Sequence, residues 1–129
     1  MAVNCLVDTN LFLEILLGQP NKEACKQFLQ QNSGQCALSD FSLHSIGVIT
    51  LRGRRPQAYR AFLLDTLPGL ALLHLDKHSY PAVLHAHDHL GLDFDDAYQI
   101  AVAQNHGLTL VTQDRDFERV KREISVRFL

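Results

Sequence analysis

Four aspartates lie near the expected ends of strands or at the start of a helix: Asp8, Asp96, Asp114 and, two positions farther on, Asp116. Asp8 and Asp114 each follow a short apolar segment with the pattern of a buried strand, and Asp96 lies in the first turn of an expected helix. In a parallel sheet the carboxyl ends of the strands share one edge, where open α/β folds bind ligands. Carboxylates gathered there repel one another unless a cation lies between them, and Mg²⁺ or Mn²⁺ prefers oxygen ligands. The sequence therefore predicts a metal site at this edge.

Each of these aspartates also has a purely structural interpretation. Carboxylates at residues 93–96 open a helix, where they satisfy free backbone N–H groups and interact favourably with the helix dipole. Asp8 and Asp114 stand at comparable turns between a strand and the element that follows. Their shared position at one edge favours a site over separate caps, whereas Asp40 is better explained as a cap.

The elements that must position these residues follow from the hydrophobic pattern. Five short apolar runs predict strands over residues 2–7, 35–38, 70–75, 108–112 and 124–128. Helical patterns lie between them at 10–17, 23–31, 39–51, 56–66, 78–90 and 93–105. Connections of this length allow consecutive strands to run parallel. We expect one α/β domain over residues 1–129, with a central parallel sheet of about five strands buried on both faces.

Composition limits the function classes further. The chain has 129 residues, of which 47% are hydrophobic, and a net charge of −2, so no bulk positive charge indicates a nucleic-acid binder. Setting the four aspartates aside leaves −2 + 4 = +2, which is compatible with a polyanionic substrate. Three cysteines without a CxxC pair predict a reducing compartment. With no basic leader and no long apolar run, we expect a soluble cytoplasmic protein.

Three segments, in this order, resemble the PIN-domain ribonucleases: Val7-Asp8-Thr9-Asn10, the segment from Leu92 to Ala101, and the segment from Leu110 to Phe117. The chain is most similar to the small single-domain bacterial members that include the VapC toxins. The resemblance implies a three-layer α/β/α fold and a magnesium site formed by Asp8, Asp96 and Asp114. It also implies that Asp116 is an adjacent acid and that Asn10 and Thr112 support the site.

The chain departs from the family at one position. The family usually carries a glutamate in the helix after the second strand, and Ser45 stands there in this sequence. Asp40, His44 or Glu14 are candidates to replace the missing carboxylate, and the sequence does not choose among them.

The resemblance also implies a reaction and partners. A metal-bound water would hydrolyse phosphodiester bonds of single-stranded or loop RNA, leaving a 5′-phosphate and a 3′-hydroxyl. Candidate contacts to the RNA backbone are Arg52, Arg54, Arg55 and Arg115. The same resemblance predicts an antitoxin partner, and the leucine-rich helix faces favour a homodimer.

Two other functions fit parts of the pattern. A flavodoxin-like signalling receiver would use Asp8 as a phosphate acceptor beside Mg²⁺, although receivers carry paired acids near the first strand and a lysine after the last. A catalytically weak PIN domain that binds RNA or protein without cutting would explain the missing glutamate.

Overall fold

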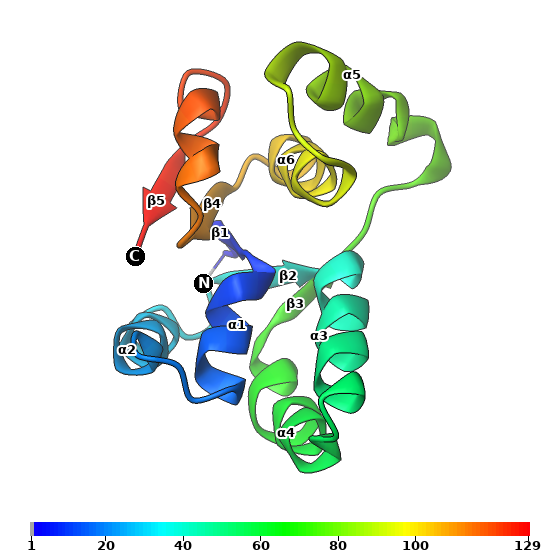
Figure 1. Ribbon diagram of the computed structural model, residues 1–129. Coiled ribbons are helices and arrows are strands. Elements are labelled where there is room, and N and C mark those ends of the chain that lie inside the picture. Colours follow the sequence, from blue (N-terminus) through cyan, green and yellow to red (C-terminus); the bar gives the residue numbers. More distant parts are fainter. Residues whose placement is uncertain (1) are drawn as a thin grey trace.

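A five-stranded parallel sheet forms the centre of the molecule, with strand order β3-β2-β1-β4-β5 (Figure 1). The computed structural model describes residues 2–129. The strands are β1 (Cys5–Val7), β2 (Cys36–Ser39), β3 (Ala71–Leu73), β4 (Thr109–Thr112) and β5 (Val126–Phe128). All five predicted strands and their parallel arrangement are thereby confirmed.

Residues 2–129 form six α-helices around the sheet. They are α1 (Thr9–Leu16), α2 (Lys22–Gln31), α3 (Asp40–Arg52), α4 (Pro56–Ala61), α5 (Pro81–Leu90) and α6 (Phe94–His106). Short 3₁₀ turns span Leu67–Gly69, Lys77–Ser79 and Arg115–Val120, and a π-helical turn spans Phe62–Thr66. Within residues 2–129, no helix is long and apolar enough to cross a bilayer.

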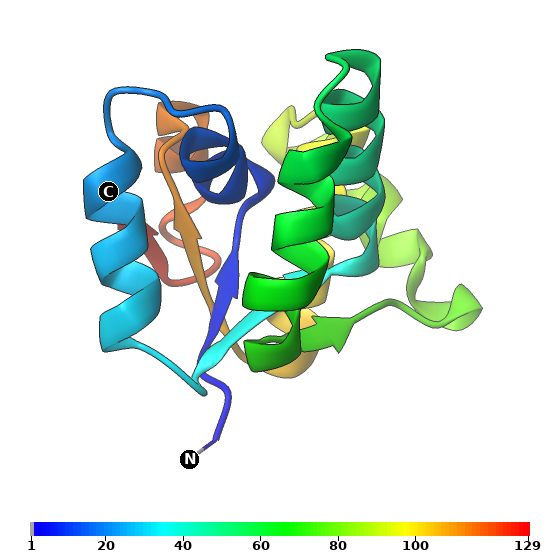
Figure 2. The same ribbon diagram turned by 90° about the horizontal axis from the view of Figure 1, so that it is seen from below.

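The sheet separates two hydrophobic cores because neighbouring residues of a strand point to opposite faces. Leu6 of β1 belongs to the core shared with α5 and α6, whereas Cys5 and Val7 belong to the core shared with α1, α2 and α3. The two groups of helices lie on opposite sides of the sheet (Figures 1 and 2). This arrangement confirms the predicted three-layer α/β/α fold.

Two predicted helices differ in extent from the structure. The pattern at 56–66 predicts one helix, but the α-helix ends at Ala61 and continues as the π-helical turn that directs Phe62 into the core. The pattern at 78–90 predicts a helix from residue 78, but α5 begins at Pro81, because proline has no N–H to donate and suits the first helical turn.

The strand order creates a crevice at the centre of one edge. The chain leaves β1 toward α1 and α2 on one face, and it reaches β4, the other neighbour of β1, from α6 on the opposite face. Ligands of open α/β sheets bind at such a switch point, beyond the carboxyl ends of the strands. The order also excludes the signalling receiver, because a flavodoxin-like sheet places β3 beside β1, where this chain has β4.

Candidate active site

A cavity of about 280 Å³ lies at this crevice. Three of the predicted carboxylates line it: Asp8 from the end of β1, Asp96 from the first turn of α6 and Asp114 from the segment after β4. Asn10, Ser45 and Asp95 also line it. The structure thus brings together acidic residues that are up to 106 positions apart in the sequence.

Asp8 is held rigidly by its neighbours. Its carboxylate accepts hydrogen bonds from the Thr9 amide (2.8 Å), the Gln99 side-chain amide (3.2 Å) and the Thr112 hydroxyl (2.7 Å). Only 7% of the residue is exposed, and this burial raises the pKa of the Asp8 carboxyl, while the three hydrogen bonds oppose the shift. Asp8 is also the N-cap of α1, so the capping interpretation and the site interpretation both apply to it.

Thr112 and Asn10 connect the two strands at the crevice. The Thr112 hydroxyl accepts hydrogen bonds from the Asn10 side-chain amide (3.3 Å) and from the Asp114 backbone N–H (2.9 Å) while it donates to Asp8. The Asn10 side-chain oxygen accepts from the backbone N–H of Gln113 (3.3 Å). These hydrogen bonds link the backbone after β4 to Asp8 and to α1.

Gln99 is a site residue that sequence reasoning missed. It lies on α6, is 2% exposed, and its amide nitrogen donates to Asp8 and to the Ser42 hydroxyl (2.9 Å). Its side-chain oxygen accepts from the Ser39 hydroxyl (2.7 Å). A glutamine within the buried run 97–103 is the signal that marks it, because a buried amide requires hydrogen-bond partners.

Asp96 is in a strongly acidic environment. Partial burial, together with the negative charges of Asp95, Asp8, Asp114 and Asp93, raises the pKa of its carboxyl to about 7. A cation placed among these groups would relieve the repulsion.

Asp114 and Asp116 occupy different positions although they are close in the sequence. Asp114 lines the cavity and caps the 3₁₀ turn Arg115–Val120 by accepting a hydrogen bond from the backbone N–H of Asp116 (2.9 Å). Asp116 is exposed and does not line the cavity. Its backbone N–H thus contacts Asp114, and the adjacent-acid role that the resemblance implies for its side chain stays a prediction.

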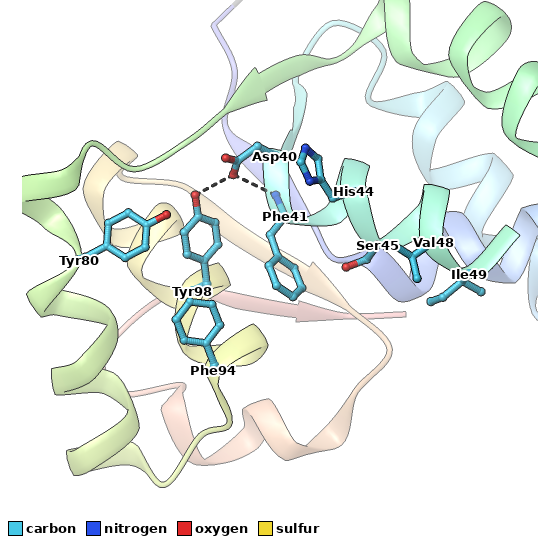
Figure 3. A pocket seen from close by; sticks show the side chains of 9 residues that line it. All are labelled: Asp40, Phe41, His44, Ser45, Val48, Ile49, Tyr80, Phe94 and Tyr98. Carbon is cyan, nitrogen blue, oxygen red and sulfur yellow. Dashed lines mark hydrogen bonds between the residues drawn. The ribbon is translucent and has the colours of Figure 1, made fainter. Parts of the chain in front are cut away.

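None of the three candidates for the missing glutamate lines the carboxylate cavity, whereas Ser45 does. Asp40 accepts hydrogen bonds from the Tyr98 hydroxyl (2.7 Å) and the Phe41 amide (2.9 Å), and it lines an adjacent cavity of about 490 Å³ together with His44 (Figure 3). Glu14 instead accepts from the Asn21 backbone N–H (2.7 Å) and the Gln113 side chain (3.1 Å). The helix α3 therefore presents no carboxylate to the cavity.

The predicted basic residues lie in two places. Phe41, Ser45 and Ile49 of α3 line the cavity at four-residue spacing, so Arg52, the last residue of α3, lies about one turn farther along the same wall. Arg54 and Arg55 follow in the exposed turn between α3 and α4. The fourth, Arg115, is next to Asp114 in the chain and pairs with Glu118 (3.2 Å).

The residues at the cavity fit a hydrated divalent cation. Among residues 2–129, no three His, Cys, Asp or Glu side chains lie close enough to ligate one ion together. Mg²⁺ requires no such cage, since it commonly binds one or two carboxylates and keeps several waters. Asp96 and Asp114 line a cavity with room for an ion and its waters, and their carboxylates are oxygen ligands of the kind that Mg²⁺ prefers.

The PIN domain family matches residues 5–123, and the chain therefore belongs to this family. No curated protein sequence matches the chain.

Solved structures share the fold at low sequence identity. DNA-bound VapBC from Salmonella typhimurium has a TM-score of 0.81 at 19% identity, covering 97% of this chain and 97% of that one. A toxin–antitoxin complex from Klebsiella pneumoniae has a TM-score of 0.73 at 23% identity, covering 88% and 90%. VapC20 from Mycobacterium tuberculosis, a sarcin–ricin loop cleaving toxin, has a TM-score of 0.74 at 19% identity, covering 89% and 93%.

Proposed function

We propose that this chain is a metal-dependent endoribonuclease, using Mg²⁺ or Mn²⁺, that acts as the toxin of a toxin–antitoxin pair. The observation that carries the proposal is the convergence of Asp8, Asp96 and Asp114 on one cavity of a PIN domain. PIN domains are in general nucleases, and among the solved structures with this fold are a toxin–antitoxin complex and an RNA-cleaving toxin.

The chain's own residues would divide the work of phosphodiester hydrolysis. Asp96 and Asp114 would hold the cation. Asp8, the third ligand that the resemblance implies, is fixed by three hydrogen bonds and would instead orient the attacking water. When bound, the cation supplies a water of lowered pKa and offsets negative charge on the phosphoryl oxygens. Arg52, at the end of the α3 wall, would contact the RNA backbone together with the two arginines that follow it. No side-chain nucleophile is needed.

We also propose an antitoxin partner and a homodimer. Large apolar side chains are exposed around the cavity of about 490 Å³: Val48, Ile49, Tyr80 and Phe94 (Figure 3). A continuous apolar surface of this kind is typical of protein–protein contacts. This surface lies beside the carboxylate cavity and shares Phe41, Ser45 and Ile49 with it. An antitoxin bound there would therefore restrict access of RNA to the carboxylates.

A catalytically weak PIN domain is the second candidate, because α3 carries Ser45 where the family has a glutamate. A module of this kind would bind single-stranded RNA with the same arginines but would not cut it at any concentration of metal.

The test is cleavage of single-stranded RNA by the purified chain with Mg²⁺ or Mn²⁺. We expect cleavage that stops on addition of EDTA and that falls at least about a hundredfold in Asp8→Asn and Asp114→Asn. Asp88→Asn, on the exposed face of α5, is the matched control and should cleave like the wild type. Circular dichroism checks that each variant is folded, and Asp114→Asn covers the case in which the buried Asp8 does not tolerate substitution.

Equal cleavage by wild type and both site variants would point to a contaminant and would contradict the proposal. Binding of RNA without any cleavage would favour the weak PIN domain instead.

A further inference from the structure

Two of the three cysteines face each other across paired strands. Cys5 of β1 and Cys36 of β2 are register partners, and their Sγ atoms lie 3.3 Å apart. Neighbouring strands lie about 4.8 Å apart, which is within the Cα separation of about 4.4–6.8 Å that a disulfide allows. A bond between these sulfur atoms therefore needs rotation of the side chains and little movement of the backbone.

A cavity reaches one member of the pair. It has a volume of about 450 Å³ and lies between the end of α2 and the turn that precedes β3, with Cys36 in its wall beside Asn32 and Asp65. Cys5 does not line this cavity. A small polar oxidant can therefore reach Cys36, although only 3% of that residue is exposed.

The contact between the two thiols shifts their pKa values in opposite directions. Contact with the Cys36 thiol lowers the pKa of Cys5, and the positive charge of Arg127 adds to this effect. Contact with Cys5, together with burial, raises the pKa of Cys36. Cys36 is thus the sulfur that the cavity reaches, and Cys5 is the sulfur placed to attack it.

We propose that Cys5 and Cys36 are a modification site at which hydrogen peroxide forms an intramolecular disulfide. First, the Cys36 sulfur takes one oxygen of the peroxide: an S–O bond forms, the O–O bond breaks, and the thiol proton leaves with the other oxygen as water. The Cys5 sulfur then attacks Cys36: the S–S bond forms, the S–O bond breaks, and a second water leaves. Two thiols are oxidised by two electrons, and one peroxide is reduced to two waters.

The disulfide would join β1 to β2 across 31 positions of sequence. Such a bond stabilises a fold mainly by restricting the unfolded chain. The pair lies at the amino-terminal side of both strands, away from the carboxylate cavity, so the site residues keep their positions. The inference does not depend on the proposed nuclease activity.

The experiment uses the wild-type chain, reduced and then treated with hydrogen peroxide. After denaturation, excess N-ethylmaleimide counts the remaining thiols by intact mass. We expect the number of labelled cysteines to fall from three to one and the mass of the protein before labelling to fall by about 2 Da. Peptide mapping should find Cys5 linked to Cys36, and the melting temperature should rise by about 5 °C or more, reversibly with dithiothreitol.

Two variants make the result specific. Cys25→Ser is the matched control, because Cys25 is also a buried free thiol but lies outside the pair, and this variant should form the same disulfide. In Cys5→Ser the second step is blocked, so Cys36 should stop at the sulfenic acid, which dimedone traps. Three labelled thiols in peroxide-treated wild type, or a bridge that includes Cys25, would overturn the proposal.

Discussion

Asp96 shows how the charge of the candidate site acts on a single residue. Its carboxyl is partly buried among acidic neighbours, which raises its pKa from the ordinary value of 3.8 to about 7. Between these two pH values the folded protein holds a proton on Asp96 that the unfolded chain has released. The free energy of unfolding therefore decreases as the pH rises through this window. Above the window, the folded protein bears the full loss of stability that comes from ionised Asp96.

Replacing Asp96 with Asn should remove this cost in metal-free protein. In EDTA at pH 8 we expect Asp96→Asn to be more stable than the wild type by about 1–2 kcal/mol, which is less than the full pKa shift implies because solvent reaches this partly exposed group. At pH 4 the difference should vanish. The melting temperatures of wild type and Asp96→Asn at the two pH values measure this difference, with Asp88→Asn as control. A gain of equal size at both pH values would mean that ionisation of Asp96 is not its cause.

Ser45 offers a second test at the residue scale. Ser45→Glu would place a carboxylate on the cavity wall where the family usually has one. We expect it to lower the melting temperature of the metal-free protein through like-charge repulsion and to increase the affinity for Mg²⁺ about tenfold. Titration calorimetry with Mg²⁺ measures the affinity. Ser45→Gln has the same size without the charge, and an equal gain in that variant would refute the role of charge.

Residues that follow strands were predictable, and residues that depend on tertiary contacts were not. Asp8 and Asp114 could be placed at one edge because the end of a strand is visible in the hydrophobic pattern, whereas Thr112 was named only through the family resemblance. Gln99 could not, because its role depends on two serines from β2 and α3 that pack against α6. Glu14 has the right chemistry, but its hydrogen bonds to Asn21 and Gln113 direct it away from the cavity.

At the scale of elements, the segment between α4 and β3 determines how one face of the sheet is covered. Phe62 begins the π-helical turn, is 1% exposed, and contacts Phe12 of α1 edge to face at 5.4 Å between ring centroids. The hydrophobic pattern predicted a helix over residues 56–66 but not the π-helical turn, because the pattern does not contain the contacts of this ring with Phe12 of α1 and Tyr59 of α4. The five strands, by contrast, were visible as separate apolar runs.

Phe62→Ala should therefore reduce the free energy of unfolding by about 3–5 kcal/mol, the usual cost of a large buried cavity. Urea unfolding followed by circular dichroism measures the loss. Leu64→Ala, in the same turn but at a side chain that is 68% exposed, should cost less than about 0.5 kcal/mol. Similar losses in both variants would mean that the turn itself, and not the buried ring, carries the stability.

The whole molecule has one face with unusual apolar exposure. Leu84 of α5 is 61% exposed, and it lies near Tyr80 and Phe94 around a further cavity of about 350 Å³. None of the residues that line this cavity lines the carboxylate cavity, so two copies can associate through it while the site stays open. Exposure on this scale favours association of two copies.

Leu84→Glu should convert the proposed dimer to a monomer, because a buried charge without a partner is costly at an interface. Light scattering after size-exclusion chromatography gives the molar mass of each form. Leu72→Glu, on edge strand β3 at 50% exposure, is the matched control and should leave the mass unchanged. A wild-type chain that is monomeric at high concentration would refute the dimer.

The hydrogen bond between Asp8 and Thr112 joins residues that are 104 positions apart. During synthesis the first strand emerges early, yet its neighbour β4 and the carboxylate that follows it emerge near the end. Contacts of such long range form late and slowly, because closing a long loop costs entropy before it gains contacts. The carboxylate cavity therefore cannot form until the ribosome has translated almost the whole domain. Any activity of the site begins only after that point.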